Sequence, residues 1–189
     1  GDEWRHVHEA HDVDYGKLIV DNTGVLVTGP GGCGKTTLMN EVAATIEREA
    51  AGRGEKVLVV KCALRHAAAR VIGGDTILYV LHKYKDVRGF WLIIDEASEV
   101  PLSMWAEMAR WKEVGVRFIV LGDFKGQAEP MFDRWVDSMK DHDIESSRFM
   151  SSLCNGLHIH LTTNWRNCED PAHFEWYTDL YKFWPYEDD

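Results

Sequence analysis

The sequence predicts an α/β fold in which helices cover both faces of a mostly parallel sheet. Short, continuous apolar runs recur along the chain, as expected for strands that are buried on both faces of such a sheet. Stretches with apolar residues at helical spacing separate these runs. A glycine-rich turn at residues 29–37 joins an early apolar run to one of the helical stretches. Strands that alternate with helices are typical of one parallel sheet.

The first elements lie on either side of the glycine-rich turn. Residues 1–21 are polar, rich in acidic residues and histidine, and without a clear period, so we expect an N-terminal surface lead-in to the first strand. Residues 24–28 are apolar and predict that strand. After the turn, the four-residue spacing of Leu38, Val42 and Ile46 predicts a helix that ends near a glycine-rich stretch.

Turn signals divide the next part of the chain. Residues 56–60 form a continuous apolar run and predict an inner strand, and residues 61–71 are expected to begin as a loop and continue as a helix. Residues 73–76 then offer a break and an N-cap. They precede a helical face made of Ile77, Val80, Leu81 and Tyr84.

The remaining elements follow the same pattern. Residues 90–94 and 116–121 predict two further buried strands. Pro101 opens a helix between them, and its large apolar residues are interpreted as core or interface rather than as a base-stacking platform. A helix near residues 145–153, a strand at 157–161 and a last helix from residue 171 complete the order.

Composition limits the classes of protein to consider. A chain of 189 residues, 45% of them hydrophobic, can bury one core, so we expect one domain over residues 22–189. The net charge of −10 argues against nucleic-acid binding driven by overall basicity. The four cysteines are scattered, which favours a reducing compartment. The sequence shows no secretory signal, and no apolar run approaches the roughly 20 residues of a membrane span. We therefore expect an intracellular protein, in the cytoplasm or nucleus, with no membrane partner.

The strongest motif is the glycine-rich turn, which fits G-x-x-x-x-G-K-[ST] between a strand and a helix. Glycines allow backbone N–H groups to surround a polyphosphate where a Cβ would block the approach. Lys35 would reach the β- and γ-phosphates of ATP, and Thr36 would place its hydroxyl on Mg²⁺. The predicted phosphate loop consists of Gly29, Pro30, Gly31, Gly32, Cys33, Gly34, Lys35, Thr36 and Thr37.

A pair of carboxylates supplies the rest of the predicted chemistry. Asp95 and Glu96 follow a buried strand, and open parallel sheets bind ligands at the carboxyl ends of their strands. Asp95 would hold hydrated Mg²⁺, and Glu96 would activate the attacking water as general base. A small-molecule kinase needs no such base, so the pair favours ATP hydrolysis.

Four motifs in order resemble the first RecA-like domain of superfamily 1 helicases, including those of large DNA viruses. They are the phosphate loop, the strand-end residues 95–98, the stretch 121–127 (LGDFKGQ) and the stretch 161–167 (LTTNWRN). The resemblance covers residues 25–166. It implies a RecA-like P-loop NTPase that binds and hydrolyses ATP as a nucleic-acid motor, with single-stranded DNA or RNA as partner.

The resemblance also implies roles for individual residues. Gln127 would sense the γ-phosphate, and Arg166 would stabilise charge in the transition state as an arginine finger does. A nucleic-acid-binding element would contain Arg65, His66, Arg70 and, in a further short element, Thr76. The sequence departs from the family's motifs at two places. Ala63-Leu64 replaces the usual Pro-Thr pair, and Gly126 adds one residue before Gln127.

Several alternatives remain open at this stage. The family closes ATP between two RecA-like domains, and no second one follows Arg166, so we expect this chain to be one domain of a larger motor. A P-loop NTPase that acts on protein partners or as an assembly switch is the main alternative, and a non-hydrolysing interaction module is a third. Two minor hypotheses concern side chains: oxidation of Cys33, and zinc binding by the N-terminal histidines or by His158 and His160 with nearby cysteines.

Overall fold

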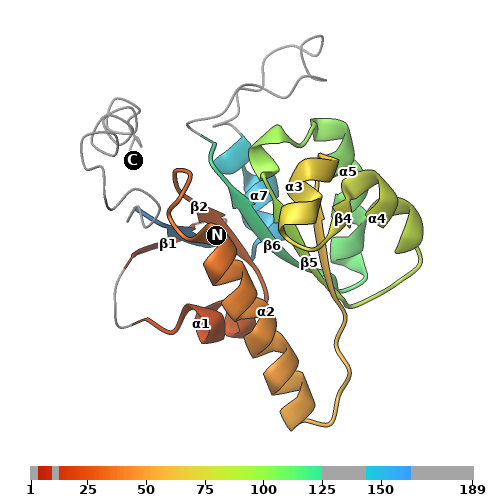
Figure 1. Cartoon of the computed structure of the whole chain (residues 1–189), viewed down its shortest axis with the longest axis horizontal. Helices are drawn as coiled ribbons and strands as arrows, with labels where there is room; N and C mark the ends of the chain where they lie inside the picture. Colours follow the sequence, from red (N-terminus) through yellow and green to blue (C-terminus); the bar gives the residue numbers. More distant parts are fainter. Residues whose placement is uncertain (1–3, 10–12, 125–143, 163–189) are drawn as a thin grey trace.

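The computed structural model describes residues 4–9, 13–124 and 144–162. These residues form a seven-stranded sheet in the order β1-β7-β2-β6-β5-β3-β4, and every strand pair is parallel. Helices flank the sheet (Figure 1). The predicted α/β fold with a parallel sheet is therefore confirmed.

The element bounds follow the expected alternation. The strands are β1 (Arg5–His8), β2 (Val25–Thr28), β3 (Val59–Ala63), β4 (Asp75–Thr76), β5 (Trp91–Asp95), β6 (Arg117–Gly122) and β7 (Leu157–His160). The helices are α1 (Tyr15–Asn22), α2 (Lys35–Gly52), α3 (His66–Val71), α4 (Ile77–Lys83), the 3-10 turn η1 (Ala97–Glu99), α5 (Leu102–Glu113) and α7 (Arg148–Leu153).

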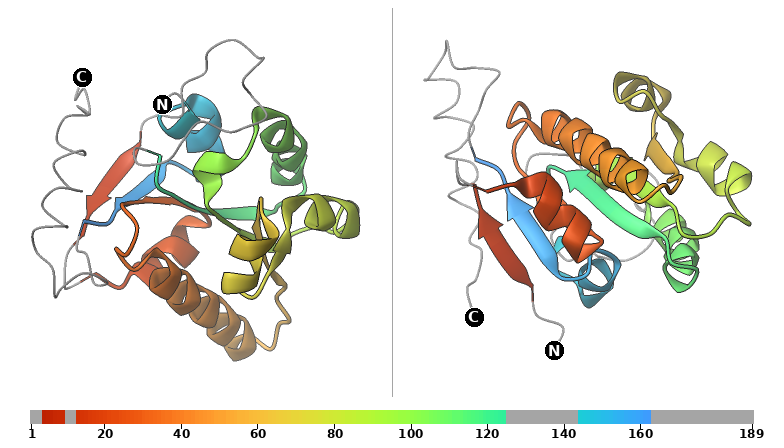
Figure 2. Two further views of the ribbon diagram at one scale, coloured as in Figure 1. Left: turned by 45° about the horizontal axis from the view of Figure 1, so that its top comes forward. Right: turned by 90° about the horizontal axis from the view of Figure 1, so that it is seen from below.

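Two apolar cores lie on opposite faces of the sheet. One is built by α4, α5 and α7, and the other by α1, α2 and α3. The views of Figure 2 show helices on both sides of the sheet. The central strand β5 serves both cores by alternation: Leu92 and Ile94 join the first, and Trp91 and Ile93 join the second. Burial on both faces explains why these strands read as continuous apolar runs.

The N-terminal expectation of a lead-in without regular structure was wrong for two segments. Arg5–His8 form β1, an edge strand beside β7, and Tyr15–Asn22 form α1, which packs on α2. Three of the four residues in β1 are exposed, so the strand carries no apolar run. Helix α1 has only eight residues, and Asp14 caps it by accepting a hydrogen bond from the Lys17 N–H at 3.0 Å.

The other differences are small. The strand expected at residues 56–60 begins later, at Val59, and continues to Ala63. Leu58, which lies in the predicted inner strand, precedes β3 and is 41% exposed. The helix expected from residue 171 lies outside the described residues. None of the helices in the described part of the chain has both the length and the apolar composition that a bilayer span requires.

The parallel pairing brings several strand ends to one edge of the sheet. β2 ends at Thr28, β6 at Gly122 and β7 at His160, and these three are neighbours by register. In the same way, Ala63 at the end of β3 lies beside Asp95 at the end of β5. The residues that follow these strand ends therefore converge, and the phosphate loop is among them.

Candidate active site

The phosphate loop leads directly into α2. Gly32 and Gly34 have φ values of 86° and 84°, a left-handed conformation that favours glycine. Gly34 is the N-cap of α2 and has no side chain to bond the first helical N–H groups. A first helical turn without a side-chain cap carries partial positive charge and presents backbone N–H donors, which suit an anion. The local structure is thus a phosphate cradle at the start of an 18-residue helix.

Lys35 lies across this loop. Its Nζ donates to the carbonyl oxygen of Gly29 and, at 2.9 Å, to that of Pro30. Its charge also lowers the pKa of Asp95, although burial is the larger influence there and acts in the opposite direction. The ammonium group therefore lies at the loop carbonyls, where a phosphate could replace them as its partner.

The base of the loop is fixed by β7. The Leu161 N–H donates to the Thr28 carbonyl at 2.8 Å. Thr28 is buried, and its hydroxyl is 2.7 Å from His158 Nε2 and 3.0 Å from His160 Nδ1. A Cβ added to Gly29 would lie 2.5 Å from the Leu161 carbonyl oxygen. Only glycine permits this approach, so β7 sets the position at which the loop begins.

Asp95 and Glu96 occupy the end of β5. The Glu96 N–H donates to Asp95 Oδ1 at 2.8 Å, and Glu96 has φ 50° and ψ 44°. A non-glycine residue in this left-handed region is uncommon and is often found at functional sites. Burial raises the pKa of Asp95, while the hydrogen bond from Glu96 opposes that rise.

Arg65 joins this site from the neighbouring strand. It follows β3 by two residues, and its Nη2 donates to Glu96 Oε2 at 3.2 Å and to Glu99 Oε1 at 2.6 Å. The hydrogen bond to Glu96 is the first of the influences that raise the pKa of Arg65. We call Arg65, Glu96 and Glu99 the Arg65 bridge. The predicted general base and a predicted nucleic-acid contact are thus bonded to each other.

Glu99 was not singled out from the sequence. It lies in η1, its side chain is 21% exposed, and its Oε2 is buried without a hydrogen-bond partner among the described residues. Burial raises the pKa of Glu99, and the charge of Glu96 adds to that rise. In the sequence, a glutamate three residues after Glu96 is only a weak indication of a site residue. The structure identifies it, because Arg65 bonds to both Glu96 and Glu99.

The other predicted site residues are distributed as follows. Thr36, Thr37, His66 and Arg70 are exposed at the carboxyl edge of the sheet or in α3. Thr76 caps α4 by accepting a hydrogen bond from the Tyr79 N–H at 3.4 Å, so its hydroxyl has a structural role. Gln127 and Arg166 lie outside the described residues.

Cys33 differs from the expected oxidation-sensitive thiol. Cys33 is only 2% exposed. Burial raises the pKa of its thiol to about 11, although the charge of Lys35 acts to lower that pKa. The reactive form of cysteine is the thiolate, which this environment disfavours. The structure therefore gives no support to facile oxidation.

Oxygen ligands for Mg²⁺ are present in the site. A threonine hydroxyl and a carboxylate are the donors that this hard cation prefers, and Thr36 in the first turn of α2 and Asp95 at the end of β5 would supply them. Zinc is a different case. Over residues 4–9, 13–124 and 144–162, no three His, Cys, Asp or Glu side chains are arranged to hold a metal ion. Cys168 and His11 lie outside these ranges.

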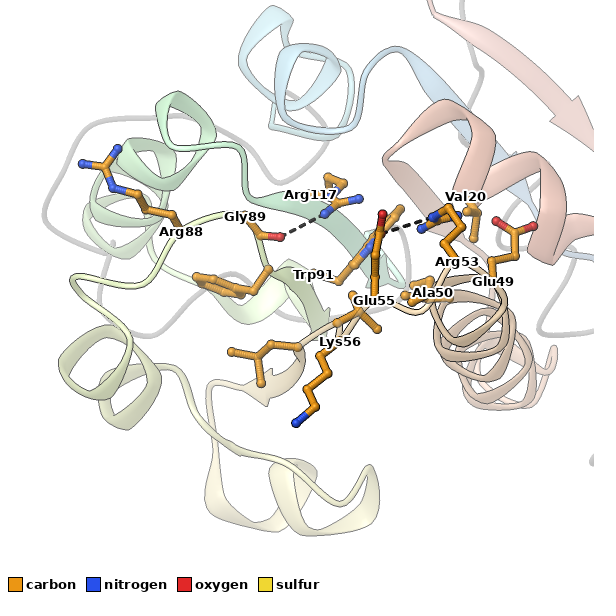
Figure 3. A pocket seen from close by; sticks show the side chains of 14 residues that line it. Val20, Glu49, Ala50, Arg53, Glu55, Lys56, Arg88, Gly89, Trp91 and Arg117 are labelled. Atoms are coloured by element: carbon orange, nitrogen blue, oxygen red, sulfur yellow. Dashed lines mark hydrogen bonds and ion pairs between the residues drawn. The ribbon is translucent and has the colours of Figure 1, made fainter.

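A cavity of about 220 Å³ opens at the opposite edge of the sheet. Its walls include Arg53, Trp91 and Arg117, and the last two are the first residues of β5 and β6 (Figure 3). The Arg117 guanidinium lies 4.8 Å from the centre of the Trp91 ring and donates to the Gly89 carbonyl at 2.9 Å. No residue of the phosphate loop lines this cavity, so we do not assign the nucleotide to it.

Comparisons with known proteins agree with this geometry. A family model described as an AAA domain matches residues 17–146. The Pif1 helicase of Candida albicans has a similar structure, with a TM-score of 0.62 and 20% identity over 90% of this chain and 43% of the helicase chain. A Bacteroides Pif1 structure in complex with ADP-AlF4 matches with a TM-score of 0.52 and 21% identity, over 84% of this chain and 43% of that one. A comparison with curated proteins gives no match.

Proposed function

We propose that this chain, which belongs to the AAA domain family, is the ATP-binding and ATP-hydrolysing motor domain of a superfamily 1 nucleic-acid helicase. One observation carries the proposal: the phosphate loop and the Asp95-Glu96 pair follow β2 and β5, two strands on either side of β6 that end at the same carboxyl edge of the parallel sheet. The RecA-like fold shared with the Pif1 structures supports it.

Binding would depend on groups already arranged by the fold. The first turn of α2 presents backbone donors to the phosphates, and Lys35 exchanges its hydrogen bonds with the Gly29 and Pro30 carbonyls for bonds to phosphate oxygens. Thr36 and Asp95 would hold Mg²⁺, which neutralises charge on the phosphates when bound. The buried contact between Thr28 and β7 keeps the loop in position.

Hydrolysis requires a base aimed at water. Glu96 is partly exposed, with 32% of its side-chain surface accessible, and therefore meets solvent beside Asp95. We assign it the role of general base, which accepts the proton of the attacking water. Gln127 would report the γ-phosphate, and Arg166 would stabilise the developing charge; both assignments rest on the resemblance of their motifs to the helicase family.

The nucleic-acid partner is assigned from the same edge of the sheet. Arg65 and His66 are exposed at the start of α3, and Arg70 is exposed in its last turn. Cationic side chains there can reach the backbone of a single strand. The chain spans less than half the length of the solved helicase chains that it resembles. A second RecA-like domain on the same protein would complete the nucleotide cleft.

The main alternative is a P-loop NTPase that acts on protein partners or as an assembly switch. The net charge of −10 and the Ala63-Leu64 pair in place of Pro-Thr favour it. It shares the nucleotide chemistry and differs only in the partner that stimulates hydrolysis.

The test is the steady-state ATPase rate of the chain with Mg²⁺, with and without single-stranded oligonucleotides. We expect a basal rate that rises with added strand and is lost in Lys35→Ala. Hydrolysis that no strand stimulates, even after a second RecA-like domain is supplied, would favour the alternative. A chain that binds no Mg·ATP in a fluorescent-nucleotide titration would refute both functions.

A further inference from the structure

The cavity beside Trp91, here named the Trp91 cavity, lies at the edge of the sheet opposite the phosphate loop. Leu58 precedes β3, and Trp91 and Arg117 are the first residues of β5 and β6. The last turns of α2 add Glu49 and Ala50. The cavity volume of about 220 Å³ is smaller than the roughly 300–1,000 Å³ of pockets that hold drug-sized ligands. The Trp91 cavity therefore suits a small molecule rather than a second nucleotide.

Cationic side chains are concentrated around this cavity, although the net charge of the chain is −10. Positively charged lining residues outnumber negatively charged ones: Arg53, Lys56, Arg88 and Arg117 against Glu49 and Glu55. Figure 3 shows that the side chains of Lys56 and Arg88 extend away from the centre of the cavity. Arg117 instead lies beside the Trp91 ring. Arg117 is therefore the cation best placed to meet a molecule in the cavity.

The Arg117 guanidinium is held in place, but its charge is not neutralised. It lies 4.8 Å from the centre of the Trp91 ring, and Trp91 is only 2% exposed, so the ring is a fixed support. Within residues 4–9, 13–124 and 144–162, no carboxylate forms an ion pair with Arg117. Burial lowers the pKa of Arg117 and the charge of Arg53 lowers it further, while Glu55 acts to raise it. An oxyanion in the cavity would stabilise this guanidinium.

Arg53 can supply a second guanidinium. It pairs with Glu55 at 3.2 Å, and the two side chains are 56% and 62% exposed. Ion pairs at such exposure contribute little net stability, so another anion can replace Glu55. Phosphate and carboxylate groups both accept two parallel hydrogen bonds from a guanidinium. The two arginines therefore offer the same type of donor to one small anion.

We propose that the Trp91 cavity binds a small oxyanion, through a phosphate or carboxylate group, with Arg117 as its main ligand and Arg53 as the second. The Trp91 ring orients the guanidinium of Arg117, and Glu55 competes with the oxyanion for Arg53. The inference goes beyond the proposed function and does not depend on it, because no residue of the phosphate loop lines this cavity.

The test is a chemical-shift titration of the ¹⁵N-labelled 189-residue chain with inorganic phosphate and with acetate, at constant ionic strength. The Nε1–H signal of Trp91 and the Nε–H signal of Arg117 report on the cavity. We expect them to shift saturably with a dissociation constant of about 1 mM, as a few charge-assisted hydrogen bonds would give. The anion that binds more tightly identifies the group that the cavity accepts.

A parallel titration of Lys35→Ala separates this cavity from the phosphate loop. The two signals should respond in this variant as they do in the wild type, whether or not the wild type binds or hydrolyses ATP. Failure of the proposed function therefore leaves this result unchanged. A response that is lost in Lys35→Ala would mean that the signals report on anion binding at the loop, and would overturn the inference.

Two substitutions with opposite expected effects identify the ligands. Arg117→Gln should weaken oxyanion binding about tenfold or more, because it removes charged hydrogen bonds. Glu55→Gln should tighten binding roughly two- to fivefold, because Arg53 loses its competitor. The matched control is Arg48→Gln, since Arg48 is an exposed arginine of α2 that does not line the cavity. This control should bind as the wild type does.

Three results would contradict the proposal. One is the absence of a saturable shift with either anion in the wild type. The others are an affinity in Arg117→Gln equal to that of Arg48→Gln, and an affinity in Glu55→Gln at or below that of the wild type.

Discussion

The two parts of the candidate active site share one edge of the sheet but are held in opposite ways. In the phosphate loop, Lys35 bonds to carbonyls of its own loop, no more than six residues away. At the end of β5, Glu96 accepts a hydrogen bond from Arg65, which follows β3 and lies 31 residues earlier in the chain. The contacts of Lys35 are therefore local, whereas the contact of Glu96 depends on the order of the strands. Changes in the loop should act on nucleotide binding, and changes at Arg65 should act on the position of the Glu96 carboxylate.

The largest effect is expected from a substitution in the phosphate loop. Lys35→Ala should lower the ATPase rate by about 10² to 10³-fold, since it removes a charge aimed at the phosphates. The fold should remain, because Lys35 belongs to neither core cluster. A coupled ATPase assay and a thermal melt measure the two effects. The control is Lys17→Ala, which removes an exposed lysine paired with Asp21. Retention of half the wild-type rate would contradict the role of Lys35.

The next effect concerns the anchor of the loop. Gly29→Ala places a Cβ 2.5 Å from the Leu161 carbonyl oxygen, so β7 or the loop must shift. We expect a loss of about 1–3 kcal/mol in the free energy of unfolding, measured by urea denaturation. Gly31→Ala is the matched control, because a Cβ there would meet no atom within 4 Å. Equal stability of the two variants would show that β7 does not constrain the loop.

A smaller effect, of opposite sign, is expected at the end of β5. Burial raises the pKa of Asp95, so folding disfavours its ionised form at neutral pH. Asp95→Asn should lose hydrolysis yet raise Tm by roughly 1 to 4 °C in the absence of nucleotide and Mg²⁺. The folded state of the wild type binds the proton more tightly than the unfolded state. Its stability therefore recovers as the pH falls through the raised pKa towards 3.8, and the advantage of the variant should shrink in that window.

Thermal melts at pH 8 and at mildly acidic pH measure this difference. The surface variant Asp21→Asn, which only loses the exposed pair with Lys17, serves as control. A lower Tm for Asp95→Asn at pH 8 would mean that hydrogen bonding, such as that from the Glu96 N–H, outweighs the cost of burial.

The smallest effect tests the local protection of the loop. With its pKa raised to about 11 and 2% exposure, Cys33 should react with N-ethylmaleimide at least about tenfold more slowly in the native chain than in urea. Mass spectrometry of the peptide that contains Cys33 gives the two rates. Similar rates in both states would show that the loop opens readily.

The same contrast explains what could be predicted from the sequence. The phosphate loop and the Asp95-Glu96 pair are contiguous signals with strict chemistry, and the apolar runs of β2, β5 and β6 identify a parallel sheet. The Arg65 bridge joins residues 31 and 34 positions apart, and the contacts of Thr28 with His158 and His160 span 130 and 132 positions. Such contacts depend on strand order, which local patterns do not encode. The exposed edge strand β1 was missed because its residues have no buried face to mark it.

The place of β7 between β1 and β2 has a consequence for the order of assembly. His6 of β1 lies 2.9 Å from His158 of β7, across 152 positions of sequence. Both neighbours of β7 are synthesised long before it. At typical translation rates, roughly 8 to 30 s pass between the synthesis of β1 and that of β7. Until then the edge of β2 is open, and closing so long a loop is entropically costly. We therefore expect the insertion of β7 to be a late step in the formation of this sheet, and its contact with Thr28 to fix the start of the phosphate loop at that point.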